Sequence, residues 1–175
     1  LANWDAALRK FVAARARKVL ANSSEIREHL IQMGVAPERV TVIPSGTDLQ
    51  RYRQAAGTDQ LTRSVLGISE NDFVIGYVGK LSPGKGVEHL VEAFCGLVES
   101  QRIPDNSRLV IVGSGTLRHM LSEKIRLRGL EEKVLFTGTR SDVYNILGAF
   151  DIFVFPSVFE GRGLALLEAM AAGRA

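Results

Sequence analysis

The feature that most constrains the fold is an alternation of short apolar segments with longer segments of helical period. The apolar segments are rich in valine, isoleucine, leucine and phenylalanine, the composition of buried strands. They cover residues 73–78, 109–112, 134–136 and 152–155. A helical pattern follows each of them, over 87–100, 116–128, 142–149 and 164–172. Strands joined through helices pair in parallel, so the sequence predicts an α/β fold with a Rossmann-like parallel sheet and flanking helices.

The residues before this alternation are predicted to form a separate, smaller part. Apolar residues recur at helical spacing over 3–18, a second helix is expected over 24–33, and a β-branched segment over 40–43 has the character of a buried strand. Residues 49–60 are polar and lack a clear period, so we take them as a linker. The predicted domains are therefore 1–48, the linker 49–60, and 61–175.

Composition and charge restrict the classes of function. The net charge of +3 suits a binder of anionic phosphates. No block of five or more like charges occurs, and the sparse aromatic residues do not interleave with basic ones, so no nucleic-acid partner is expected. Cys95 is the only cysteine, which favours a reducing, cytoplasmic compartment. The three histidines lack ligand spacing, so no metal site is expected.

Two glycine-containing loops follow predicted strands, at the sheet edge where ligands of such folds bind. The loop 79–86 contains Lys80 and Lys85, and its glycines and the helix after it favour a phosphate. Its spacing approaches a P-loop, but Gly86 stands where that motif needs Ser or Thr to hold magnesium. The loop 113–118 begins like a dinucleotide fingerprint, but Arg118 occupies the third glycine position, where a long side chain should hinder helix packing. Ordinary strand-to-helix turns remain the alternative for both loops.

Two glutamates flank the start of the last predicted helix. Glu160 lies in the loop before it, and Glu168 lies about two turns along it. The rest of this helix is almost wholly apolar, which predicts burial on all sides. A buried carboxylate needs a partner, and the hydroxyls of a ligand such as ribose can supply one. The alternative is that Glu168 meets an internal Arg or Lys and Glu160 caps the helix in solvent.

These motifs together resemble the retaining glycosyltransferases of family 4, also called group 1, which have the two-domain GT-B fold. The resemblance rests first on residues 159–171, which place two glutamates with seven residues between them in a Phe-Glu-Gly-x-Gly-Leu context. Segments 42–48, 76–86 and 109–115 match in the same order as in that family. The resemblance implies the donor-binding domain of a GT-B enzyme, incomplete at its C-terminus, preceded by the last elements of the acceptor domain.

The resemblance also implies roles for individual residues. Glu160, Lys80 and Lys85 would serve catalysis, with the lysines on the diphosphate as charge develops on the leaving group. Glu168 would bind the ribose. The donor would further contact a set of loop residues, namely Gly79, Gly161, Arg162, Gly163, Leu164, Gly138, Thr139 and Arg140. The implied activity is retaining hexosyl transfer from a UDP-, GDP- or ADP-sugar to a saccharide or lipid-linked acceptor, in polysaccharide biosynthesis, without a cofactor.

The sequence departs from the family pattern at three points. Lys80 replaces the usual arginine, which loses the bidentate fork, and Arg162 replaces a commonly aromatic residue. The chain begins at Leu1 and stops within an apolar helical pattern, so we expect a fragment that is inactive alone. The basic residues of helix 3–18 offer a peripheral contact with an anionic membrane, although packing on another domain is favoured. A P-loop-like NTP hydrolase, a nucleotide-sugar epimerase and a non-catalytic sugar-binding module remain alternatives.

Overall fold

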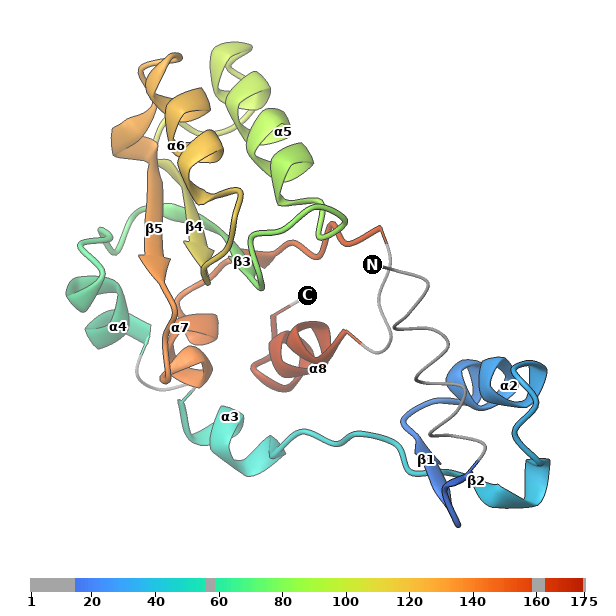
Figure 1. The fold of residues 1–175 in the computed structure, drawn as a ribbon. Coiled ribbons are helices and arrows are strands. Elements are labelled where there is room, and N and C mark those ends of the chain that lie inside the picture. The colour runs from blue at the N-terminus through green and yellow to red at the C-terminus, as the bar shows by residue number, and fades with distance from the viewer. Residues whose placement is uncertain (1–14, 56–58, 159–162, 175) are drawn as a thin grey trace. The chain divides into compact units, whose positions relative to one another are not determined.

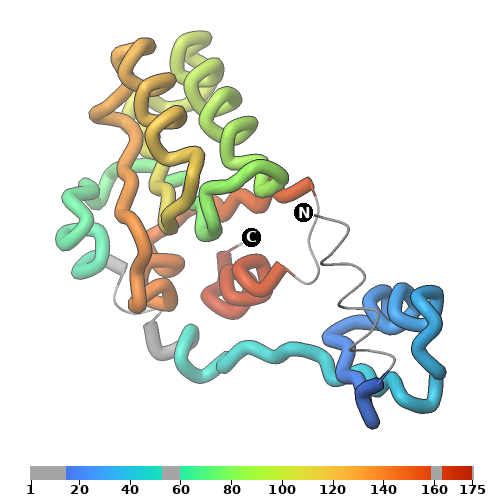
Figure 2. Tube along the Cα trace, in the orientation of Figure 1, coloured from blue at the N-terminus to red at the C-terminus, as the bar shows by residue number. Residues whose placement is uncertain are grey.

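The computed structural model describes residues 15–55, 59–158 and 163–174 (Figure 1). The chain forms two compact units, Leu1–Gly46 and Thr47–Ala175. The path of the chain through each unit can be followed in Figure 2.

The first unit contains a small parallel sheet. Strand β1 (Val19–Ala21) pairs with β2 (Val40–Val42), and helix α2 (Ser24–Gln32) and the 3-10 helix η1 (Pro37–Arg39) connect them. The Ser23 hydroxyl caps α2 by accepting a hydrogen bond from the Ile26 amide at 3.2 Å. Among the described residues of this unit, the buried core consists of Ala21, Val35 and Val40.

The second unit is built on a parallel sheet in the order β5-β4-β3-β6. The strands are β3 (Phe73–Val78), β4 (Ser107–Val112), β5 (Val134–Gly138) and β6 (Ile152–Phe153). Every pairing among them is parallel, as the alternation in the sequence predicted. The α/β class with a Rossmann-like sheet is confirmed.

Helices cover both faces of this sheet because successive strand residues point to opposite sides. Along β4, Leu109 and Ile111 pack in one core cluster with helices α5 (Val87–Glu99) and α6 (Arg118–Arg126). Val110 and Val112 pack in the other, with α7 (Val143–Gly148) and α8 (Leu164–Ala171). The sheet is therefore buried on both faces, which explains its nearly continuous apolar strands.

The stretch expected to be a linker is largely helical. Helix α3 (Leu49–Ala55) precedes α4 (Asp59–Val65), and both belong to the second unit. The Asp48 carboxylate accepts hydrogen bonds from the Gln50 and Arg51 amides, at 3.1 and 3.3 Å, and so begins α3. Tyr52 joins the core cluster beneath α7 and α8. The polar composition of this segment did not indicate helix α3, which buries the aromatic side chain of Tyr52.

The prediction that the last helix is buried on all sides is wrong. Ala169 is the one fully buried residue of α8. Leu164, Leu166 and Met170 are 48%, 38% and 59% exposed. The helix packs against α3 and α7 and enters the second core cluster through its alanines, whereas these three larger residues are exposed.

Candidate functional site

A cleft lies at the carboxyl edge of the sheet, where the loops after β3, β4 and β5 meet. Its volume is about 400 Å³. The lining residues are Val78, Gly79, Lys80, Val112, Gly113, Ser114, Gly115, Thr139, Arg140 and Val143. Four of the predicted site residues are thus brought together, namely Gly79, Lys80, Thr139 and Arg140. This is the edge at which ligands of open α/β sheets bind.

The two glycines after β4 allow the neighbouring loop to pass close to them. A Cβ at Gly113 would lie 2.0 Å from the Gly79 carbonyl oxygen, and one at Gly115 would lie 2.2 Å from that of Leu81. The Leu81 amide also donates to the Ser114 carbonyl oxygen at 2.9 Å. The partial dinucleotide fingerprint is therefore explained by the packing of two loops that line the cleft.

Arg118 fits against the sheet without hindering its helix, contrary to expectation. Its guanidinium lies 3.7 Å from the centre of the Phe136 ring on β5, a cation–π contact. Burial lowers the pKa of Arg118. The long side chain thus lies flat on an aromatic ring instead of separating the helix from the strand.

The two lysines of the first loop lie in different settings. Lys80 is exposed and lines the cleft, and its carbonyl oxygen accepts a hydrogen bond of 3.1 Å from the buried Tyr77 hydroxyl. Lys85 is partly buried and does not line the cleft. Its part of the loop is held by the Val158 amide, which donates to the Gly84 carbonyl oxygen at 3.1 Å. Lys80 is the lysine placed to meet an anion in this cleft.

Gly86 has no room for a side chain. It begins α5 in the left-handed region, with φ of 67°. A Cβ there would lie 2.0 Å from the Pro156 carbonyl oxygen. The serine or threonine that a P-loop needs at this position cannot be accommodated without moving Pro156, which disfavours the P-loop-like hydrolase.

The loop after β5 forms the opposite wall of the cleft. The Thr139 and Ser114 hydroxyls lie 3.0 Å apart, and the Gly113 amide donates to the Gly138 carbonyl oxygen at 2.8 Å. The Arg140 guanidinium donates two hydrogen bonds of 2.8 Å to the Asp142 carboxylate, and these hold the pKa of that carboxyl below its usual value. Arg140 therefore lines the cleft as one half of an ion pair.

The glutamate segment is described only in part. Glu160, Gly161 and Arg162 lie outside the described residues. Gly163 begins α8 with φ of 51°, and a Cβ there would lie 2.9 Å from the Phe155 ring. Leu164 is half exposed and does not line the cleft.

Glu168 has a partner within the protein. It is partly buried on α8 and forms a side-chain hydrogen bond with Tyr52 of α3. The carboxylate therefore does not depend on a ligand for a partner, and the internal partner is a tyrosine where Arg or Lys was considered. Tyr52 escapes prediction because the polar composition of residues 49–60 indicates a linker. The available signal was Asp48, a capping residue, followed by Leu49 and Tyr52 at helical spacing.

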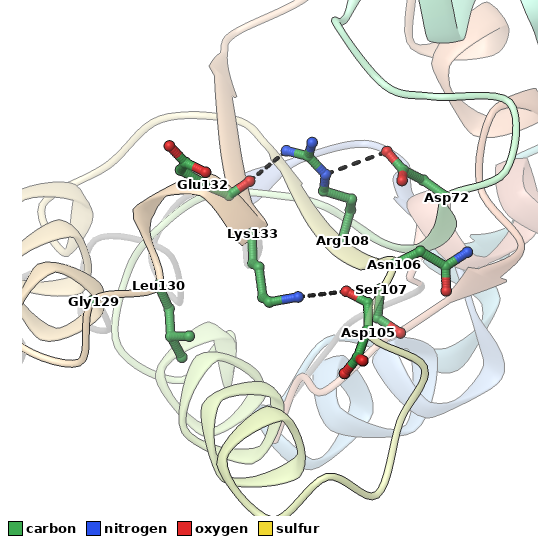
Figure 3. Close-up of a pocket in the computed structure, with 9 residues that line it drawn as sticks. All are labelled: Asp72, Asp105, Asn106, Ser107, Arg108, Gly129, Leu130, Glu132 and Lys133. Atoms are coloured by element: carbon green, nitrogen blue, oxygen red, sulfur yellow. Dashed lines mark hydrogen bonds and ion pairs between the residues drawn. The ribbon is translucent and has the colours of Figure 1, made fainter.

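A second pocket lies at the amino edge of the sheet (Figure 3). Arg108 pairs with Asp72 at 3.3 Å and donates to the Glu132 carbonyl oxygen, while Lys133 donates to that of Asp105. Both cations of this pocket are thus engaged with the protein. None of the predicted site residues lies here, and ligands of such sheets bind at the other edge, so the carboxyl-edge cleft is the candidate site.

The fold and the cleft define an α/β domain of the Rossmann-like class with a ligand site at the carboxyl edge of its sheet. The chain belongs to the glycosyl transferases group 1 family, whose model matches residues 59–175. Residues 1–51 match the glycosyltransferase family 4 model. The resemblance seen in the motifs is confirmed.

Characterised relatives and solved structures agree with this assignment. The chain is 37% identical over 165 residues to UDP-Gal:alpha-D-GlcNAc-diphosphoundecaprenol alpha-1,3-galactosyltransferase of Escherichia coli, covering 93% of this chain and 42% of the enzyme. The structure of Anabaena Alr3699/HepE in complex with UDP-glucose superposes with a TM-score of 0.82 at 28% identity, over 99% of this chain and 48% of that one. The structure of WaaG, a glycosyltransferase involved in lipopolysaccharide biosynthesis, gives a TM-score of 0.76 at 30% identity, over 90% and 42%. The chain therefore spans less than half the length of these proteins.

No helix among the described residues has the length and apolar character needed to cross a membrane. Within the same residues, no group of three or more His, Cys, Asp or Glu side chains is placed to hold a metal ion.

Proposed function

We propose that the protein of which this chain is part transfers a hexose from a UDP-sugar to a saccharide or lipid-linked acceptor. The observation that carries the proposal is the carboxyl-edge cleft, which Lys80 lines together with Thr139 and Arg140. Family membership supports glycosyl transfer. A UDP donor is supported by HepE, solved with UDP-glucose, and by the E. coli relative, named for UDP-Gal.

The cleft suggests a division of roles along the donor. Lys80 is the exposed cation of the cleft, so we assign it to the diphosphate, where it would stabilise the leaving group as charge develops. The wall around Gly138, Thr139 and Arg140 would border the base. Glu168 would accept hydrogen bonds from the ribose hydroxyls with the lone pairs that Tyr52 leaves available.

The remaining assignments rest on the family motif. Glu160, with the amides of 161–164, would contact the transferred sugar, and Lys85 would support the diphosphate. We further propose transfer with retention of the anomeric configuration and without a metal. The anomeric proton coupling of the product, followed by NMR during turnover, distinguishes retention from inversion.

Nucleotide binding by the full-length protein tests the donor site. In titration calorimetry, UDP should bind more tightly than GDP or ADP, and Lys80→Ala should weaken UDP about tenfold without changing the affinity for uridine. Lys133→Ala is the matched control, because it removes the same charge at the opposite edge of the sheet. Equal loss of UDP affinity in both variants would contradict the proposed placement of the diphosphate.

The products separate this proposal from its alternatives. A transferase converts the UDP-sugar to UDP only in step with the glycosylated acceptor. An epimerase interconverts two UDP-sugars, and a sugar-binding module releases no UDP. Chromatography of the nucleotide products with and without acceptor resolves these cases.

A further inference from the structure

Helix α3 brings a buried hydroxyl to the proposed ribose-binding glutamate. The Tyr52 side chain is 8% exposed and belongs to the core cluster that also contains Ala169 of α8. Its hydroxyl forms a hydrogen bond with the side chain of Glu168, which directly precedes Ala169 in the sequence. The ring thus packs in the core while the hydroxyl lies against a carboxylate that is partly exposed.

The direction of this hydrogen bond follows from charge. Burial, followed by the negative charge and the hydrogen bond of Glu168, raises the pKa of Tyr52 to about 12. The phenol therefore keeps its proton at neutral pH, and an ionised carboxylate can only accept. Tyr52 donates to Glu168, which occupies part of the accepting capacity of the carboxylate and fixes its orientation.

Further contacts hold α3 against both α7 and α8. The Arg51 guanidinium lies 4.0 Å from the centre of the Tyr144 ring on α7. The first residue of α7, Val143, lines the carboxyl-edge cleft. Helix α3 also packs against α8, which carries Glu168. Helix α3, which does not line the cleft, thus contacts both α7, whose first residue lines the cleft, and α8, which carries Glu168.

We infer that Tyr52 is a positioning residue for the donor nucleotide, which holds the Glu168 carboxylate in the orientation that receives the ribose hydroxyls. The inference rests on the proposed role of Glu168. A carboxylate already fixed by the protein loses little rotamer freedom when the ribose binds, so the hydrogen bond favours binding by preorganisation.

The test compares UDP with 2′,3′-dideoxy-UDP, which lacks the hydroxyls that Glu168 would bind. Titration calorimetry on the full-length protein uses wild type, Tyr52→Phe and Glu168→Gln. Tyr52→Phe keeps the buried ring and removes only the donor, so it should weaken UDP about tenfold and leave the dideoxy ligand as in wild type. Glu168→Gln should show the same pattern. Tyr144→Phe is the control, because it removes a hydroxyl from α7 but keeps the ring beneath Arg51, and it should bind UDP as wild type does.

Each outcome decides one claim. If Glu168→Gln changes the affinity for neither ligand, the ribose role fails and the inference fails with it. If Glu168→Gln weakens UDP but Tyr52→Phe does not, the proposed function stands and the positioning role of Tyr52 is overturned. Equal weakening of both ligands by Tyr52→Phe would show a structural role only, and thermal melts of each variant report whether it folds.

Discussion

Arg63 of α4 and Asp151, just before β6, form an ion pair of 2.9 Å at the amino edge of the sheet. The guanidinium also donates to the carbonyl oxygens of Ala149, Glu70 and Asp72, at 3.1, 3.1 and 3.0 Å. Asp151 accepts a second hydrogen bond of 2.7 Å from the Val74 amide. One arginine therefore joins α4, the turn before β3 and the turn before β6.

Replacing Arg63 should destabilise the protein. Its side chain is 12% exposed, and Arg63→Ala would leave several partly buried acceptors without their donor. We expect a loss of about 2–4 kcal/mol in the free energy of unfolding, measured by urea denaturation. Arg126→Ala is the comparison, because Arg126 forms an exposed pair with Glu123 on one helix and should have little effect. Similar losses in both variants would contradict this account.

Gly86 should tolerate no side chain. Gly86→Ala would place a Cβ 2.0 Å from the Pro156 carbonyl oxygen in a left-handed conformation. The backbone strain alone costs about 1–3 kcal/mol, and the contact adds to it, so both the melting temperature and the affinity for UDP should fall. Gly96→Ala on the same helix is the control, because its Cβ meets nothing within 4 Å. That exposed helical position should gain about 0.5–1 kcal/mol. Unchanged stability in Gly86→Ala would refute the close approach.

The parallel sheet was predictable because each of its strands and helices is indicated by the pattern of residues within that segment alone. Each of β3, β4 and β5 contains a run of apolar residues and is followed by a helical pattern, and the right-handed crossover rule restricts how such units assemble. The same alternation of strands and helices predicted which loops lie at the carboxyl edge of the sheet. What local patterns could not supply is the reason for each glycine: Gly113 is required by Gly79, a residue on another strand's loop.

The surroundings of Glu168 were not predictable for a related reason. Hydropathy showed that α8 is apolar, but it did not show that its alanines pack in the core while Leu166 and Met170 are exposed. The partner Tyr52 lies on a helix whose other residues are mostly polar, so its contact with Glu168 depends on the tertiary fold. Burial faces and long-range polar pairs are set by packing, which a single sequence pattern does not encode.

The identity of the cation at position 80 should control the diphosphate contact. Lys80→Arg keeps the charge and adds a planar fork suited to phosphate, so UDP should bind at least as tightly as to wild type. Any gain in affinity for UDP over wild type should be smaller for UMP, because UMP lacks the second phosphate. Isothermal titration with UDP, UMP and uridine measures this series. A clear loss of UDP affinity in Lys80→Arg would show that the cleft accepts only the smaller ammonium group.

The burial of Tyr52, together with the negative charge and the hydrogen bond of Glu168, should make stability depend on alkaline pH in a way that Tyr52→Phe isolates. The folded state holds the pKa of Tyr52 at about 12, against 10.0 ordinarily, so the unfolded phenol ionises first. The stabilisation is fully present below pH 10 and is lost as the pH rises toward 12. The difference in free energy of unfolding between wild type and Tyr52→Phe should therefore stay constant up to about pH 10. Above that pH it should fall, by up to about 2 kcal/mol.

Urea denaturation at a series of pH values measures this difference, and other ionising groups cancel because both proteins contain them. A wild-type advantage that stays constant to pH 12 would mean that Tyr52 ionises equally in the folded and unfolded states. The hydroxyl would then be neither buried nor in contact with Glu168, which would contradict the described packing of α3 against α8.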